Sequence, residues 1–420
     1  MNSSVAISTG VPGGRHYGLM LGVFAGLLLI AAIWLGVTLS TAPDSVPWGS
    51  FVASYIYLLG ITQFGVAFAA ILRICRTKWA RPFYRLGELM TLAYFPFAIG
   101  VFLLIFCYGR TEIFYWLSAE PGEHLSPWLN ADFLLVRNLI AQLVFYLLAA
   151  AYFIIGLLPD ITADSAATGP AWRRSMYRFL SKLGQGRDPR RLQSCMYLMA
   201  PLIIITAVIS NTFISWDFGM MLVPHYHSSV FPMYFAMGSM VAGSAAMLVM
   251  GALMSRILDL GAYFGTVQAK SLGILLTSLV LFWVYLFWAQ FFVSWFGNLP
   301  NEFGPLWVQM YGHYAPLFWT QMICIIAIPI GTMIFAPVKR TWWAMVLIGA
   351  VINVGVWINR YLIVVPALEE NAVPFSSLFE LILFLGLISG FMLVLLWLMN
   401  IFPMISSWEM RDAEDSNPVY

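Results

Sequence analysis

Long apolar runs separated by short polar segments dominate the pattern along the chain. A hydrocarbon core of about 30 Å requires roughly 20 apolar helical residues. Since only helices or closed barrels satisfy every backbone group in lipid, such runs predict membrane-spanning helices. Ten runs qualify, and they cover residues 17–38, 51–72, 86–107, 133–158, 192–215, 230–254, 272–296, 316–335, 342–363 and 378–401.

This pattern predicts an all-α polytopic membrane protein with one ten-helix transmembrane domain, residues 17–401. A segment 1–16 precedes it, an acidic tail 402–420 follows it, and a basic loop 159–191, read as a surface loop or short amphipathic piece, interrupts it. Composition agrees, because 61% of residues are hydrophobic and only 10% are charged, whereas soluble domains carry about a quarter charged residues. A formal charge of +2 argues against a nucleic-acid partner.

Positive charge is distributed unevenly between the two sides of the predicted bundle. With the amino terminus inside, 18 of the 21 Lys and Arg fall on the cytoplasmic side. Only Arg110 and Arg360 map to the outer face, and Arg137 lies about one turn inside the fourth helix. Because Lys and Arg are retained in the cytoplasm, we expect both termini to be cytoplasmic.

Metal ligands are sparse. The four cysteines, Cys75, Cys107, Cys195 and Cys324, lie far apart and form no Cys-x-x-Cys pair, so they predict neither an iron–sulfur cluster nor a zinc ribbon. The five histidines map to loops or helix ends, not to facing pairs inside the bilayer, which disfavours b-type haem. We expect the chain to carry no metal, haem or cluster of its own, so that any such cofactor lies on a partner.

The segment 215–235, SWDFGMMLVPHYHSSVFPMYF, places Asp217, His225, Tyr226 and His227 together at the outer face. A carboxylate beside an imidazole suits proton exchange near neutral pH. We therefore predict Asp217 and His225 as catalytic proton acceptors, with Tyr226 and His227 as contacts of the bound molecule. Two alternatives are interfacial anchoring and a metal site, for which only Asp217 is an evident third ligand.

Arg137 lies in the segment 128–138, WLNADFLLVRN. An intramembrane arginine is costly and normally faces a partner or a wet cavity. The alternative is snorkelling of its long side chain to the outer surface. Asp132, five positions earlier, points to a different face of the helix and need not be its partner.

The seventh run ends in the segment 283–302, WVYLFWAQFFVSWFGNLPNE, where Phe287, Gln290 and Ser294 share one face. Gln290 needs a hydrogen-bond partner, and aromatic surface with a few donors suits a flat, amphipathic quinone ring. The alternative is packing or lipid contact. Pro300 predicts a turn in the loop that follows.

Four acidic residues are candidates for a proton path. Asp132, Glu302 and Glu380 map to the outer level, and Glu88 maps to the cytoplasmic side, where solvation of a helix end is the alternative.

The segments 128–138, 215–235 and 283–302 resemble the NrfD or polysulfide-reductase (PsrC-like) membrane subunits. The chain is most similar to the ActF-type subunit of alternative complex III, and next to the ActC-type subunit. This resemblance implies two four-helix bundles flanked by extra helices, in a multi-pass protein of the bacterial inner membrane. It also implies a bound quinol, menaquinol or ubiquinol, near the periplasmic face, contacted by Arg137, Gln290, Tyr226 and His227.

The resemblance further implies an oxidoreductase complex that is catalytic only when assembled. Its partners are a periplasmic iron–sulfur subunit, cytochrome c subunits, a sister NrfD-like membrane subunit and lipid. The expected role is quinol binding or oxidation in a respiratory chain, with proton translocation as an additional expectation. Two other functions stay open: a structural or proton-path subunit without an active quinone site, and a secondary transporter, which would show broken helices and charges at the midplane.

Overall fold

The computed structural model describes residues 15–118, 126–161, 170–184, 188–224, 226–258 and 260–410. Within these residues it contains helices and no strands, and ten spans are long and apolar enough to cross a membrane. The predicted all-α class and ten spans are therefore confirmed. The spans are α1 (Arg15–Thr41), α2 (Trp48–Ile74), α3 (Arg81–Leu104), α5 (Ala131–Leu157), α8 (Pro189–Asp217), α9 (Phe231–Ile257), α10 (Thr266–Phe296), α12 with α13 (Ala315–Met322 and Ile328–Met333), α15 (Trp342–Val364) and α16 (Leu378–Ile401).

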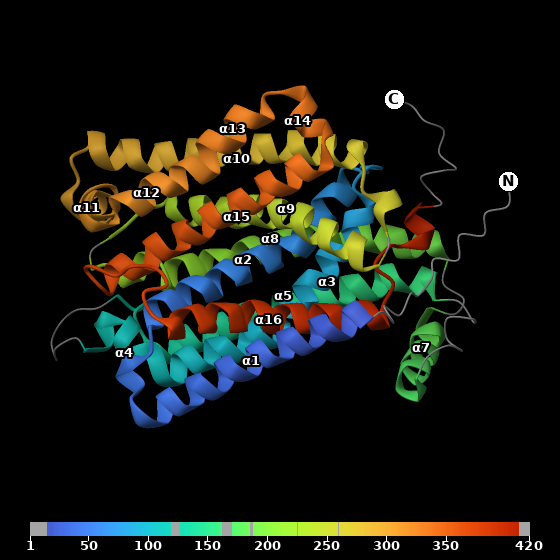
Figure 1. The fold of residues 1–420 in the computed structure, drawn as a ribbon, viewed down its shortest axis with the longest axis horizontal. Coiled ribbons are helices and arrows are strands. Elements are labelled where there is room, and N and C mark those ends of the chain that lie inside the picture. Colours follow the sequence, from blue (N-terminus) through green and yellow to red (C-terminus); the bar gives the residue numbers. More distant parts are fainter. Residues whose placement is uncertain are drawn as a thin grey trace.

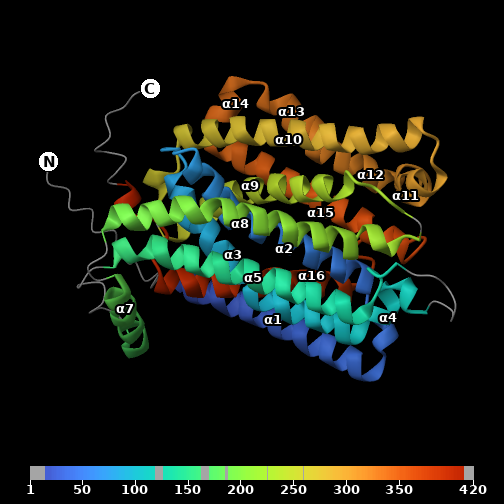
Figure 2. The same cartoon turned by 180° about the vertical axis from the view of Figure 1, so that it is seen from behind.

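The spans form two four-helix bundles. Helices α2, α3, α5 and α8 pack together as the first bundle, and α9, α10, α12 with α13, and α15 form the second. Helices α1 and α16 pack on each other and α16 also packs on α3, so this pair flanks the first bundle (Figure 1). The view from behind shows α5 and α8 side by side on the opposite face (Figure 2).

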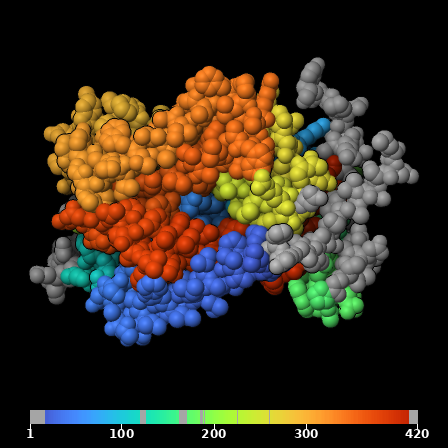
Figure 3. Space-filling model, in the orientation of Figure 1, coloured from blue at the N-terminus to red at the C-terminus, as the bar shows by residue number. Residues whose placement is uncertain are grey.

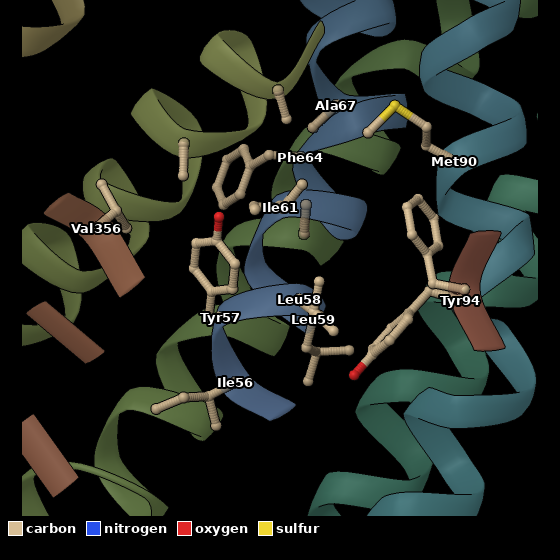
Figure 4. Packing of buried hydrophobic residues seen from close by; sticks show 14 of the residues in the cluster. Ile56, Tyr57, Leu58, Leu59, Ile61, Phe64, Ala67, Met90, Tyr94 and Val356 are labelled. Atoms are coloured by element: carbon tan, nitrogen blue, oxygen red, sulfur yellow. The ribbon is translucent and has the colours of Figure 1, made fainter. Parts of the chain in front are cut away.

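Helix α2 lies at the centre, where it contacts both bundles. Almost all of its side chains are buried, and Figure 4 shows Leu59 and Phe64 among the packed residues around it. Its backbone approaches α3 closely, since a Cβ atom added at Gly65 would lie 2.6 Å from the carbonyl oxygen of Gly87. Because lipid supplies no hydrophobic force between helices, such small-residue contacts are what bring helices together.

Two of the spans contain a π-helical turn, Ile105–Gly109 after α3 and Ile323–Ala327 between α12 and α13. The eighth span therefore continues through its irregular turn and is not broken. Four short helices of the described residues lie outside or at the ends of the spans: α4 (Arg110–Ile113), α7 (Ala171–Gly184), α11 (Pro300–Met310) and α14 (Ala336–Arg340). Helix α11 corrects the predicted turn at Pro300, because proline is well suited to the first position of a helix.

The two ends of the molecule differ in their side chains. We call the end that carries α7, the last turn of α2 and the first turn of α3 the basic end, and the end that carries α4 and α11 the aromatic end (Figure 1). Helix α1 begins and α16 ends at the basic end. The two chain ends of the helical domain thus share one side, as an even number of spans requires.

The outer surface of the bundle is apolar. Leu198 on α8 is 76% exposed and Phe296 on α10 is 75% exposed, which suits lipid and not water. Helix α1 presents a nearly continuous apolar face and runs along one edge of the surface in Figure 3. Exposed aromatic side chains gather at the aromatic end, as at a membrane–water interface: Trp288, Phe292, Trp295, Trp307 and Tyr311.

The segment after α16 is packed and ordered around buried charges. Glu409 accepts a hydrogen bond from Nε of Arg73 at 2.8 Å, and its own backbone oxygen accepts from Arg81. Asp160 accepts from the backbone N–H groups of Ser407 and Trp408 at 2.8 and 3.2 Å. Residues 402–410, predicted as part of an acidic tail, therefore dock on the basic end; residues 411–420 lie outside the described part of the chain.

Candidate functional site

Asp217, at the last turn of α8, is held in a buried ion pair. Arg137 on α5 donates to both of its carboxylate oxygens, through Nε at 3.0 Å to Oδ2 and through Nη2 to Oδ1. Asn138 Nδ2 and Trp128 Nε1 donate to the same carboxylate at 2.6 and 3.0 Å. The Arg137 guanidinium also lies 4.1 Å from the centre of the Trp128 ring, within cation–π range.

This geometry decides between the two interpretations of Arg137. Its side chain is buried and faces a carboxylate, so it does not snorkel to the surface. The partner is Asp217, 80 residues away, and Asp132 is exposed on another face, as expected. The four donated hydrogen bonds and the Arg137 guanidinium satisfy the buried carboxylate, which ties the end of α8 to α5.

Gln290 and Tyr226 form a second buried pair at the aromatic end. Gln290 Nε2 on α10 donates to the Tyr226 hydroxyl in the loop between α8 and α9. The predicted need of Gln290 for a partner is thus confirmed, whereas its Oε1 is buried and has no hydrogen-bond partner among the described residues. Burial raises the pKa of the Tyr226 phenol above its ordinary value, so the hydroxyl keeps its proton at physiological pH.

A cavity of about 360 Å³ opens beside this pair. Its walls come from the loop after α8, from α11 and from the end of α15, and an adjacent smaller cavity of about 30 Å³ reaches Gln290 and Tyr226. Val223, Pro305, Gln309 and Ile363 line both parts. Apolar walls with a few polar groups at one end are typical of a site for a small amphipathic molecule.

An aromatic wall lies behind Gln290. Phe287, one turn earlier on α10, stacks on Trp283 with ring centres 5.8 Å apart and contacts Tyr234 of α9 at 6.2 Å. Ser294, one turn later, is buried and donates back to the backbone oxygen of Gln290. The predicted face of Phe287, Gln290 and Ser294 is therefore directed into the protein.

The remaining predicted residues of segment 215–235 are separated from one another. Asp217 faces α5 in the first bundle, whereas Tyr226 faces α10 in the second. The side chain of His227 is exposed, and His225 lies outside the described residues. Arg137, predicted to share a polar wall with Gln290, is not among the residues that line either part of the cavity.

Three of the predicted proton-path residues lie in the first turns of helices. Asp132 begins α5, Glu302 begins α11 and Glu380 begins α16, where acidic side chains favour the positive end of the helix dipole. Glu380 Oε2 accepts from the backbone N–H of Ser376 at 3.1 Å, while its buried Oε1 has no hydrogen-bond partner in the described part of the chain.

Glu88 occupies a different environment at the basic end. Its side chain is fully buried and forms ion pairs with Arg73 and, at 3.5 Å, with Arg85. The alternative of a solvated helix end is therefore wrong for Glu88. Arg85 in turn reaches Asp160 at 2.9 Å, which links α2, α3 and the end of α5 through charge.

Polar side chains missed by the sequence analysis line the interior of the first bundle. Gln142 on α5 donates to the Tyr55 hydroxyl at 3.2 Å. Near the middle of α2, Gln63 donates to Ser210 and accepts from Asn211, both on α8. Helical spacing alone could have flagged Asn138 and Gln142, which lie one turn apart on one face of α5.

Arg360 lies in a second network of buried hydrogen bonds, in the second bundle, which the sequence did not predict. The sequence places Arg360 at the outer level of the membrane; its side chain is fully buried and donates to the Phe235 backbone oxygen at 2.6 Å and to Ser239 at 3.0 Å. Among the described residues no carboxylate pairs with it. Its neighbour Asn359 donates to Tyr234 at 2.6 Å, so the network extends across α9.

The fold and these buried polar pairs define a polytopic helical membrane subunit. Within the described residues no group of three or more His, Cys, Asp or Glu is placed to hold a metal. Over residues 38–372 the chain matches the family described as Polysulphide reductase, NrfD, and it therefore belongs to that family. Proteins of this family are membrane subunits of quinone-interacting oxidoreductase complexes. Among curated proteins, none matches the chain closely enough to count as a relative.

Proposed function

We propose that the cavity at the aromatic end binds the ring of a quinol, menaquinol or ubiquinol, beside Gln290 and Tyr226. The observation that carries the proposal is the unpartnered Oε1 of Gln290 at the end of an apolar cavity. A buried acceptor without a partner costs about 1–3 kcal/mol, and a quinol hydroxyl would satisfy it. The stacked rings of Trp283 and Phe287 supply the flat surface beside it.

The two polar groups suit both redox states of the ring. Gln290 Oε1 can accept from a quinol hydroxyl, and the protonated Tyr226 hydroxyl can donate to a quinone oxygen. Oxidation of quinol to quinone releases two electrons and two protons. His225, next to Tyr226 in the sequence, remains our predicted proton acceptor, because an imidazole titrates near neutral pH.

Asp217 fits a positioning role better than that of a proton acceptor. Protonation of its carboxylate would leave Arg137 buried without a counter-charge, which is costly. Its ion pair instead anchors the end of α8, from which Gly219 and Val223 lead to the cavity. We therefore propose that the proton acceptor is His225, in the loop after α8, and not Asp217.

We propose that electrons leave this chain for a partner subunit, because membrane subunits of this family are parts of larger oxidoreductase complexes. We propose a periplasmic iron–sulfur subunit docked at the aromatic end, with cytochrome c subunits and a sister NrfD-like subunit in the same complex. The finer assignment, an ActF-type subunit of alternative complex III in a bacterial inner membrane, rests on the three motifs described above.

The test compares three variants in the assembled complex. We expect Gln290→Leu and Tyr226→Phe each to raise the KM for quinol about tenfold, equivalent to about 1.4 kcal/mol of binding. Ser294→Ala is the matched control, because its hydroxyl bonds only to the backbone of the same helix. Steady-state quinol oxidation at several quinol concentrations provides the measurement.

Normal KM and kcat in both variants would contradict the proposed quinol site. This result would favour the second candidate function, a proton-path subunit. The polar interior of the first bundle favours that candidate, since Asp217, Gln142, Gln63 and Glu88 occupy successive levels between the two ends. A secondary transporter is disfavoured, because the interior charges of the described helices lie near the two ends and the eighth span is unbroken.

A further inference from the structure

We infer that α7 is an interfacial helix, which lies along the membrane surface at the basic end with an apolar face in the bilayer and a basic face toward anionic head groups. Both views show α7 lying crosswise to the spans, at their ends (Figure 1, Figure 2). A helix in this orientation runs along the plane of the membrane that the spans cross. Helix α7 lines neither cavity of the aromatic end, so the inference stands independently of the proposed function.

Contacts with the bundle fix the rotation of α7 about its own axis. Arg173 Nε and the Tyr177 hydroxyl both donate to the backbone oxygen of Ile401, at 3.2 and 2.7 Å, where α16 ends. Leu180 is buried on the same face, because the spacing i, i+4, i+7 places these three side chains of α7 in one row. Since this face is held against the protein, the remaining faces of the helix have defined directions.

A second face of α7 is apolar and exposed. Trp172, Phe179 and Leu183 share one stripe by helical spacing and are 50%, 67% and 40% exposed. Trp172 stacks on Trp397 of α16 with ring centres 6.3 Å apart, and Trp397 is itself 53% exposed on the surface of a span. The apolar stripe of α7 is therefore continuous with the lipid-facing surface of α16. Exposed tryptophans at the end of a span are typical of the membrane–water interface.

The third face of α7 is basic. Arg174, Arg178 and Lys182 follow one another at intervals of four residues, and all three are exposed. Within α7, whose residues 171–184 are all described, there is no acidic side chain on any face. A basic stripe beside an exposed apolar stripe is the pattern of a helix that lies on an anionic bilayer. The continuity of the apolar stripe with α16 favours lipid over a soluble protein as the occupant of this surface.

Spin labels measure the depth of α7 in the full chain, in a background without the four native cysteines. A nitroxide is attached at Phe179→Cys on the apolar stripe or at Arg174→Cys on the basic stripe, and each protein is reconstituted into vesicles of phosphatidylglycerol and phosphatidylethanolamine. Power saturation compares collisions with oxygen, which enters lipid, and with a nickel chelate, which stays in water.

We expect the oxygen-to-nickel collision ratio to be about fivefold higher at Phe179→Cys than at Arg174→Cys, because the apolar face of an interfacial helix is buried in the bilayer. Equal ratios at the two positions would overturn the proposal. Protection of Phe179→Cys from both reagents would also overturn it, since this result would mean that a second copy of the chain covers the stripe.

A second comparison tests the basic stripe with the label kept at Phe179→Cys. Replacing phosphatidylglycerol by neutral phosphatidylcholine should lower the collision ratio about twofold, and Arg178→Gln with Lys182→Gln should remove this dependence on lipid charge. Lys339→Gln with Arg340→Gln on α14 is the matched control and should keep the dependence. A ratio that does not change with lipid charge would overturn the assignment to anionic lipid, and so would loss of the dependence in the α14 control.

Discussion

The Arg137–Asp217 pair shows how strongly a single buried charge depends on its counter-charge. Both side chains are buried in the first bundle, at the level where α5 and α8 reach the aromatic end. Removing one partner of such a pair typically costs about 3–5 kcal/mol, whereas replacing both by apolar residues costs far less.

We predict that Asp217→Asn lowers the free energy of unfolding by about 3 kcal/mol, because Arg137 keeps only neutral acceptors. Unfolding by SDS in mixed micelles provides the measurement. The double variant Asp217→Leu with Arg137→Met should recover more than half of this loss. A single variant as stable as wild type would show that water or lipid already screens the pair.

The pairing of Arg137 with Asp217 could not be predicted from the sequence. Arg137 needs a partner, but Asp217 lies 80 residues away in another helix, and nothing in the sequence shows that the two helices meet. In a membrane protein the lipid face and the interior face of a helix look alike in composition, so hydrophobic periodicity does not indicate which helices meet. The same reason explains why the partners of Arg360 and the contacts of Gln63 were not predicted.

At the scale of helices, the contact between α2 and α3 depends on two glycines. A Cβ atom at Gly87 would lie 2.4 Å from the backbone oxygen of Gly65, and backbone atoms on both sides leave no flexible side chain to move away. Gly100, on the same helix α3, has no atom within 4 Å of such a Cβ.

Gly87→Ala should therefore separate the two helices and destabilise the protein by about 1–3 kcal/mol. Gly100→Ala serves as the control and should be neutral or stabilising by up to about 1 kcal/mol, since alanine is the better helix former. The same SDS titration measures both. Equal effects of the two substitutions would contradict the close backbone contact.

The spans themselves were predictable because their length and hydropathy are properties of one segment at a time. All ten predicted runs overlap an observed span. Elements whose stability depends on other segments were not predicted: α11 begins at Pro300, where a turn was expected, and the π turn Ile323–Ala327 has no marker in the sequence.

For the molecule as a whole, we predict that the basic end faces the cytoplasm and the aromatic end faces outward, because Lys and Arg are retained on the cytoplasmic side. Cysteines introduced at Ser175 on α7 and at Asn301 on α11, both exposed, lie at the basic and aromatic ends. In a background without the four native cysteines, an impermeant maleimide should label Asn301→Cys in intact cells and Ser175→Cys only after the membrane is opened. Labelling of both positions in intact cells would contradict the ten-span topology.

The docked segment 402–410 makes the basic end the last part of the protein that can be completed during synthesis. Arg73 and Glu409 are separated by 336 residues, so the ribosome has made every span before the second carboxylate partner of Arg73 exists. Until then Arg73 has Glu88 alone, and Asp160 lacks the two backbone donors of Ser407 and Trp408. A nascent chain released before residue 402 would therefore contain all ten helices and still lack the segment that binds Arg73, Arg81 and Asp160 at the basic end.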